Sequence, residues 1–326
     1  MSDDDGTLHL DRQIRVPTSI SEQAQAALRA AVPIVHERLA NPEVSPPLDD
    51  AEAWRARNAA TDAHIVSMFE GRAPDVDWEL REIAGVPVFE IRPDGADLSD
   101  DGPILYDIHG GALVAGGGEA CRLMASGAAL RSGLRTFAID YRIAPDHPYP
   151  AALDDCIAVY RALLERFPAE RIVVDGASAG GNLVAALLVR AHDEGLPKPA
   201  AAMMFTPELD LTESGDTFDV LHGVDVILVQ RLTDTIALYA NGHDLTHPYL
   251  SPLFADVSHF PPSFIQAGTR DLFLSNAVRM HRKLRTANVD AELHVWEAMP
   301  HGGFGGAPED VEMVIEVRKF LAKHLG

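Results

Sequence analysis

The residues best suited to covalent chemistry centre on Ser178, which lies in the pentapeptide Gly-Ala-Ser-Ala-Gly at residues 176–180. The β-branched run Ile172–Val174 precedes it, and an Ala/Leu/Val-rich stretch that stops at Gly195 follows it. A serine between glycines at a strand-to-helix turn is typical of a nucleophile elbow, because the sharp turn exposes the hydroxyl. The start of the helix also brings backbone N–H groups and a positive dipole end to a carbonyl under attack. The pattern predicts acyl transfer by a nucleophilic serine.

His301 is the predicted general base. After an elbow of this kind the chain order is serine, then acid, then histidine, and the histidine lies in a loop beyond the last strand. His301 meets this condition, since it follows the strand predicted at Ala291–Trp296. His294 lies inside that strand and is expected to be a packing or surface residue. The histidines after Ser178 lack the spacing of metal ligands on a helix, so no metal site is expected.

Asp271 is the predicted acid. It follows the preceding predicted strand, Ser263–Ala267, where its carboxylate can accept the imidazole N–H and leave the other ring nitrogen free for the serine. Two alternatives stay open. Asp271 is also a suitable N-cap for the helix predicted from Phe273. Glu297 is a rival acid, although it lies close to the histidine in the sequence.

A third motif, His109-Gly-Gly-Ala112, follows the strand predicted at Ile104–Ile108. Small residues let the backbone approach a substrate, and loops in this position supply N–H groups opposite the elbow. The oxyanion hole is expected to consist of Gly110, Gly111, Ala112 and Ala179. The N–H groups of the last three are the predicted donors, and a turn without a function is the alternative. His109 is expected to hold the loop through hydrogen bonds.

The elements that position these motifs alternate between strand and helix from residue 76 onward. The sequence begins there with a hairpin at Trp78–Ile91, and the last predicted helix is Glu309–Leu325. This order predicts an α/β fold: a mostly parallel sheet of eight strands with helices on both faces. Residues 76–326 would form the catalytic domain.

Two segments fall outside this alternation and are expected to form a helical cap over the serine. Residues 1–75 contain helices predicted at Ser21–Val32, which Pro33 would end, and at Asp50–Glu70. The second segment separates two core strands between Thr206 and Pro262, with the cap insertion at about 208–250 and one helix predicted at Asp225–Ala240. An additional packing layer is the alternative to a lid.

Composition limits the partners and the location. The formal charge of −22 argues against nucleic acid and anionic membranes as partners. Cys121 and Cys156 fall in predicted helices and are expected to be reduced core residues. The acidic start at residues 1–5 is unlike a signal peptide, and long apolar runs are lacking, so a cytoplasmic location is expected.

At this point the chain resembles the hormone-sensitive-lipase-like family of α/β-hydrolases, from about residue 85 to the C-terminus. The motifs that carry the resemblance are His109-Gly-Gly, the segment Asp140–Asp155, Ser178-Ala-Gly-Gly-Asn182, Ser251-Pro-Leu253 and His301. The resemblance implies carboxylic ester hydrolysis with Ser178, Asp271 and His301 as the triad. It also implies a cap made from the two segments above and no cofactor, and it leaves a monomer or a homodimer open.

Three departures from the family pattern stand out. Ala112 replaces the third glycine of the oxyanion motif, and Ala177 replaces the usual Asp or Thr before the serine. The segment after Asp271 lacks the second Asp that many members carry. None of the three removes a member of the predicted triad.

Related reactions remain alternatives to ester hydrolysis. Amidases, lactonases and transacylases use the same triad, so the sequence does not separate them. A small-molecule receptor of this fold loses the histidine, whereas His301 is present. The cap offers apolar side chains without a basic cluster, which predicts acyl chains of about C2 to C8. These side chains are Leu28, Val32, Phe69, Phe218, Val226 and Leu228.

Overall fold

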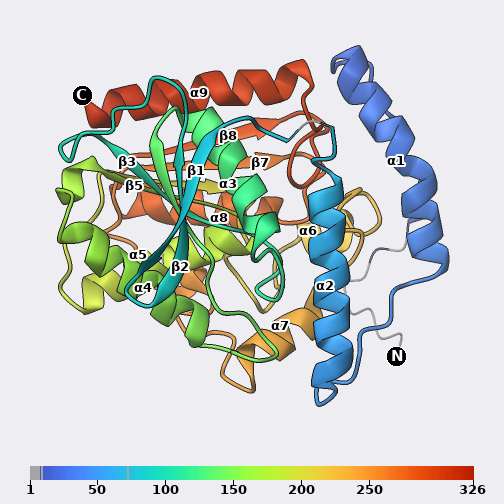
Figure 1. The fold of residues 1–326 in the computed structure, drawn as a ribbon. Helices are drawn as coiled ribbons and strands as arrows, with labels where there is room; N and C mark the ends of the chain where they lie inside the picture. Colours follow the sequence, from blue (N-terminus) through green and yellow to red (C-terminus); the bar gives the residue numbers. More distant parts are fainter. Residues whose placement is uncertain (1–7, 9, 72) are drawn as a thin grey trace.

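A mixed sheet of eight strands runs through the molecule in the order β1-β2-β4-β3-β5-β6-β7-β8 (Figure 1). The computed structural model describes residues 8, 10–71 and 73–326. The hairpin β1–β2 and the pair β2–β4 are antiparallel, and all later pairs are parallel, as the alternating pattern predicted. The strands are Asp77–Ile83 (β1), Val86–Arg92 (β2), Ile104–Ile108 (β3), Arg135–Ile139 (β4), Ile172–Ala177 (β5), Ala201–Phe205 (β6), Ser263–Gly268 (β7) and Ala291–Trp296 (β8).

Helices cover both faces of the sheet because successive side chains of its central strands point to opposite faces, and each face receives apolar side chains. In β5, Val173 packs towards one face, while Ile172 and Val174 pack towards the other. The face of Val173 is covered by α3 (Glu119–Ser132) and α9 (Pro308–Leu325). The opposite face is covered by α4 (Ala151–Leu164), α5 (Ala179–Asp193) and α8 (Leu274–Thr286). Short 3₁₀ turns lie at Ala169–Arg171 and Pro252–Phe254.

A buried ion pair joins two neighbouring strands. Glu90 of β2 is 1% exposed, and its Oε1 lies 2.6 Å from Nη2 of Arg135 in β4. Arg81 of β1 contacts the same carboxylate. Burial opposes ionisation of Glu90, but the hydrogen bonds and charges of the two arginines outweigh it and lower the pKa of Glu90.

The first helix of the chain, α1 (Glu22–Ala40), runs through Pro33. The prediction that Pro33 ends this helix was therefore wrong. Its buried positions, Ala24, Leu28 and Val35, lie on both sides of the proline, so packing holds the two halves together despite the lost hydrogen bond. The Ser21 side chain caps the helix by accepting from the Ala24 N–H, as predicted.

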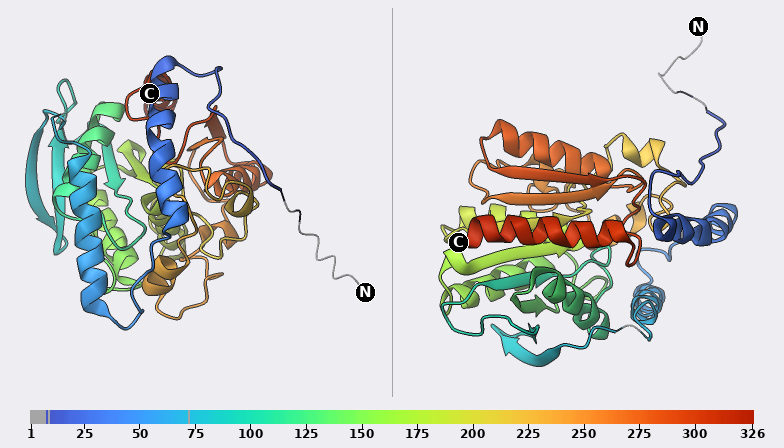
Figure 2. Two further views of the ribbon diagram at one scale, coloured as in Figure 1. Left: turned by 90° about the vertical axis from the view of Figure 1, so that its right-hand side faces the viewer. Right: turned by 90° about the horizontal axis from the view of Figure 1, so that it is seen from above.

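The second helix, α2 (Ala51–Ser67), starts at Asp50 as predicted. Figure 2 shows α1 and α2 standing at one end of the sheet, apart from the helices that cover its faces. Residues 1–7, 9 and 72 of this N-terminal segment lie outside the described residues.

The insertion between β6 and β7 contains two short helices, α6 (Thr217–Val220) and α7 (Thr233–Ala240). The helix predicted over Asp225–Ala240 is therefore wrong in its first half. Asp225 Oδ1 accepts the N–H groups of Ile227 and Leu228, at 2.9 and 3.3 Å, and such a local turn competes with helix formation.

The described helices all fall short of the length and apolarity that a membrane span needs. Cys121 and Cys156 are buried free thiols, as predicted.

Candidate active site

Ser178 lies at the turn between β5 and α5 with φ 57° and ψ −122°, a strained backbone for a residue with a side chain. The surrounding glycines are required by space. A Cβ atom on Gly180 would lie 1.9 Å from the Ile108 carbonyl oxygen, and one on Gly176 would lie 2.5 Å from the carbonyl of Gly180. The Ser178 N–H donates to the Phe205 carbonyl at 2.8 Å, which ties the turn to the next strand. The turn therefore has the form of a nucleophile elbow with a half-buried serine.

His301 and Asp271 form a buried pair. Nδ1 of His301 lies 3.0 Å from Oδ1 of Asp271, and the two residues are 7% and 0% exposed. Because Nδ1 faces the carboxylate, Nε2 is the ring nitrogen left for other chemistry. Both residues lie in loops after β7 and β8, and β5 ends in Ser178, so all three follow carboxyl ends of parallel strands. The ring of Phe273 covers the imidazole edge-on, 5.1 Å away.

The charges around His301 favour the protonated form of its imidazole. Burial lowers the pKa of His301, but its hydrogen bond to Asp271, the charge of Asp271 and the charge of Asp225 outweigh burial and raise it above 6.5. An imidazolium that forms here during a reaction is thus stabilised by the neighbouring carboxylates.

The structure bears on both alternatives for the acid, which were Asp271 acting only as a helix N-cap and Glu297 in place of Asp271. Asp271 Oδ1 also accepts the Phe273 N–H at 3.0 Å, so the same carboxylate orders the start of α8 while it holds His301. Glu297 is exposed on the loop after β8. His294 stacks on Phe264, with ring centroids 4.5 Å apart, and is a packing residue.

The glycine loop after β3 lies directly against the elbow. A Cβ atom on Gly110 would be 2.8 Å from the Ala177 carbonyl oxygen and 3.3 Å from Cβ of Ser178. Gly111 has φ 128°, and its added Cβ would lie 2.0 Å from the Ala115 carbonyl oxygen. Ala112 has φ 53°, a conformation that glycine adopts without strain, so the alanine is accommodated at some cost.

His109 supports this loop from behind. Its Nδ1 donates to the Gly110 carbonyl at 2.7 Å, and its ring stacks on Tyr141, with centroids 4.0 Å apart. The Tyr141 hydroxyl in turn donates to the His109 carbonyl at 2.9 Å. Burial lowers the pKa of His109, which keeps the ring neutral. These contacts agree with the predicted role of His109 in holding the loop.

Asp225 is a site residue that the sequence reasoning missed. One oxygen of Asp225, one oxygen of Asp271 and one nitrogen of His301 all lie within 4.8 Å of one another. These atoms resemble a metal-ligand set, but Nδ1 faces Asp271 Oδ1, and backbone amides donate to Asp271 Oδ1 and to Asp225 Oδ2. Asp271 Oδ2 is buried without a hydrogen-bond partner among the described residues. The arrangement therefore fits a hydrogen-bonded network better than a metal site. The only sequence signal was an acidic residue that begins an apolar stretch in the insertion.

A second buried carboxyl group lies close to the elbow. The Glu208 N–H donates to the Ser178 carbonyl at 3.2 Å. Burial and the nearby charge of Glu213 raise the pKa of Glu208 to about 8, so this side chain is neutral at pH 7.

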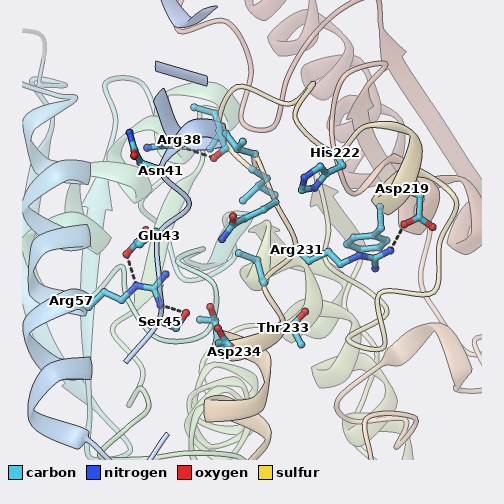
Figure 3. Close-up of a pocket in the computed structure, with 17 residues that line it drawn as sticks. Arg38, Asn41, Glu43, Ser45, Arg57, Asp219, His222, Arg231, Thr233 and Asp234 are labelled. Carbon is cyan, nitrogen blue, oxygen red and sulfur yellow. Dashed lines mark hydrogen bonds and ion pairs between the residues drawn. The ribbon is translucent and has the colours of Figure 1, made fainter. Parts of the chain in front are cut away.

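A cavity of about 650 Å³ lies between α1, α2 and the insertion (Figure 3). Two of its three arginines form ion pairs: Arg57 pairs with Glu43 at 2.8 Å, and Arg231 pairs with Asp219 at 2.7 Å. The third, Arg38, donates to the Ile227 carbonyl at 3.2 Å. Leu228 at its wall packs towards Leu272 and Phe273, the residues next to Asp271. Of the six apolar cap residues named from the sequence, Phe218 and Leu228 line this cavity.

Comparisons with known proteins agree with this geometry. Residues 105–304 match a protein family described as alpha/beta hydrolase fold. The carboxylic ester hydrolase LipN of Mycobacterium tuberculosis is 30% identical, over 84% of this chain and 78% of LipN. The crystal structure of an esterase superposes with a TM-score of 0.90 at 34% identity, covering 98% of this chain and 100% of that one. An esterase from the bacterial hormone-sensitive lipase family gives 0.81 at 32% identity, covering 92% and 99%.

Proposed function

Because the chain belongs to the α/β-hydrolase fold family, in its bacterial hormone-sensitive-lipase-like branch, we propose that it is a carboxylesterase whose nucleophile is Ser178. The observation that carries this proposal is the buried Asp271–His301 pair at the same end of the sheet as the strained elbow of Ser178.

The reaction proceeds in two half-reactions. Nε2 of His301 takes the hydroxyl proton of Ser178 as the serine oxygen attacks the ester carbonyl. The tetrahedral intermediate collapses when His301 returns that proton to the departing alcohol, which leaves an acyl-serine. Water then attacks the acyl group and gives one proton to His301. His301 returns that proton to the Ser178 oxygen as the second tetrahedral intermediate collapses, which releases the carboxylic acid and free Ser178. Asp271 stays ionised and holds the imidazole in the tautomer that both steps need.

The oxyanion is stabilised by backbone N–H groups of Gly111, Ala112 and Ala179, with Gly110 holding the loop against the elbow. Support comes from the close approach of Gly110 to Ser178 and from the position of Ala179 at the first turn of α5. Donors fixed in the fold need no reorganisation when charge develops on the carbonyl oxygen.

Residues 1–75 and about 208–250 form the cap, with residues 76–326 as the catalytic domain that carries this insertion. The cap bears the cavity described above, which Phe218 and Leu228 line and which Ser178 and His301 do not. The apolar side chains of the cap support a small ester with an acyl chain of about C2 to C8 as the substrate. The acidic surface disfavours nucleic acid and anionic membranes as partners and agrees with a cytoplasmic enzyme. A homodimer remains compatible with this architecture.

The test is turnover of an aryl acetate and of its matched anilide by the purified full chain. We expect hydrolysis of the ester to exceed that of the amide, and Ser178→Ala to remove nearly all activity while the fold persists, since only a hydroxyl is lost. The matched control is Ser258→Ala, a surface serine that bonds only to the nearby Asp256. Full activity in Ser178→Ala would contradict the proposal.

The same assays separate the alternative reactions. A faster reaction with the amide than with the ester would indicate an amidase, and faster acyl transfer to an added alcohol than to water would indicate a transacylase. Faster opening of a cyclic ester than of an open one would indicate a lactonase.

A further inference from the structure

The Asp225 carboxylate connects three separate parts of the chain. Its Oδ1 accepts from Ile227 and Leu228 in its own loop, and its Oδ2 accepts the Leu272 N–H at 2.9 Å. Oδ1 also accepts the N–H of His301 at 3.4 Å. Asp225 is completely buried, so its carboxylate depends on these four donors in place of water. One side chain of the insertion thus binds the residue after Asp271 and the backbone of His301.

We propose that Asp225 is a positioning residue of the esterase, which fixes the loops of Asp271 and His301 and places a second negative charge beside the imidazole. This inference rests on the proposed function, because it assigns Asp225 a role in the reaction of Ser178. It also implies that the base is correctly placed only when the insertion is docked on the two loops.

The charges around His301 support this role. Two titratable groups act on the imidazole: Asp271 from the loop after β7 and Asp225 from the insertion. Phe273, at the start of α8, covers the ring with an uncharged side chain. Both carboxylates raise the pKa of His301 and stabilise the imidazolium that forms when Ser178 loses its proton.

Asp225 itself is ionised in the range where the enzyme would work. Burial and the charge of Asp271 raise its pKa to about 6, while His301 and the amide donors of Ile227 and Leu272 oppose that rise. Four N–H donors match an ionised carboxylate, since a protonated one would turn one oxygen into a donor. At neutral pH, Asp225 is therefore mainly ionised and contributes negative charge beside the imidazole.

The deciding experiment is the pH profile of Asp225→Asn. An amide keeps the size of the side chain but removes the negative charge. Its NH₂ group is a donor, so at least one backbone N–H that now donates to Asp225 would lose its acceptor. We expect kcat for an aryl acetate to fall about 10- to 100-fold. We also expect the acid limb of kcat/KM to move to lower pH by about one unit, because the imidazole loses a stabilising charge. Asp244→Asn is the matched control, since Asp244 lies in the same insertion, is exposed, bonds to the neighbouring Thr246 and is not among the residues that line the cavity. This control should have the same kcat as the wild type, and the acid limb of its kcat/KM profile should lie at the same pH.

A second variant separates charge from fit. Asp225→Glu keeps the charge on a longer side chain, so the acid limb should stay at the wild-type pH while kcat falls. Should Asp225→Asn fold poorly, the rate of labelling by a fluorophosphonate at each pH reports the His301 ionisation in the folded fraction alone. If the acid limb of kcat/KM in Asp225→Asn lies at the same pH as in the wild type, the inference is overturned, whether or not kcat falls. Wild-type protein that neither takes the label nor hydrolyses esters would instead refute the proposed function itself.

Discussion

Gly110 and Ser178 lie so close together that a methyl group on Gly110 would come 3.3 Å from Cβ of the serine and 2.8 Å from the Ala177 carbonyl oxygen. The glycine loop and the elbow are therefore a single packed unit, and any side chain between them must push them apart. This contact fixes how closely the glycine loop approaches Ser178.

Gly110→Ala tests the oxyanion loop. The φ of Gly110 lies outside the left-handed region, so alanine fits its backbone and only the contact with Ala177 and Ser178 changes. We expect kcat to fall by about 10²–10³, the cost of one lost oxyanion donor, with a smaller change in KM. Steady-state kinetics beside a thermal melt measure this. Ala112→Gly is the control, because it keeps the N–H and relieves a φ of 53°, so activity should persist and bulkier acyl groups should enter. Normal turnover in Gly110→Ala would place the oxyanion hole elsewhere.

The pH dependence of activity should follow His301. Only the neutral imidazole accepts the serine proton, so kcat/KM should rise with pH through a pKa above 6.5, the direction that Asp271 and Asp225 impose.

The free energy of unfolding should change with pH in the opposite direction, falling as the pH rises. A group whose pKa is raised in the folded state stabilises the fold below its unfolded pKa, and this contribution is lost as the pH rises through the folded value. Rate profiles and urea midpoints between pH 5 and 9 test both. A flat rate profile would exclude His301 as the base.

The buried pair of Glu90 and Arg135 should be important for stability. Arg135→Met leaves the Glu90 carboxylate in the core without its one buried partner, while the more exposed Arg81 stays in contact. Breaking a buried pair costs about 3–5 kcal/mol. Urea unfolding measures the loss. Arg166→Met is the control, because Arg166 pairs with Asp100 on the surface, where both side chains are exposed and a pair contributes about 1 kcal/mol or less. Equal effects of the two substitutions would refute the importance of burial.

Acyl-chain preference tests the cap. Because apolar side chains such as Phe218 and Leu228 line the cap, we expect the highest kcat/KM on esters of about C2 to C8. A panel of aryl esters from acetate to palmitate measures the preference. Phe218→Ala removes a buried aromatic ring from the cavity wall and should move the optimum to longer chains. A preference for long-chain triglycerides, or for charged acyl groups, would contradict this assignment.

Local patterns were sufficient to predict the elbow, the pair of Asp271 and His301, and the sheet. Each depends on a short stretch of sequence at a known place in the strand and helix order. Asp225 could not be found in this way, because its partners Leu272 and His301 lie 47 and 76 positions further along the chain. The apolar residues that follow Asp225 also gave a helical pattern, which its turn overrides. Pro33 was misjudged for a similar reason, since the packing of α1 is tertiary information.

The start of α1 is hydrogen-bonded to the start of α9. The Ser21 N–H and hydroxyl both donate to the Glu309 carboxylate at 2.7 Å, across a separation of 288 residues. On the ribosome, that separation corresponds to roughly 15 to 60 s of synthesis at typical elongation rates. The sheet up to Ser178 can begin to assemble during that interval, while His301 and the anchor of α1 emerge together at its end. The base proposed for Ser178 and the anchor of α1 are therefore both absent from the nascent chain until that interval has passed.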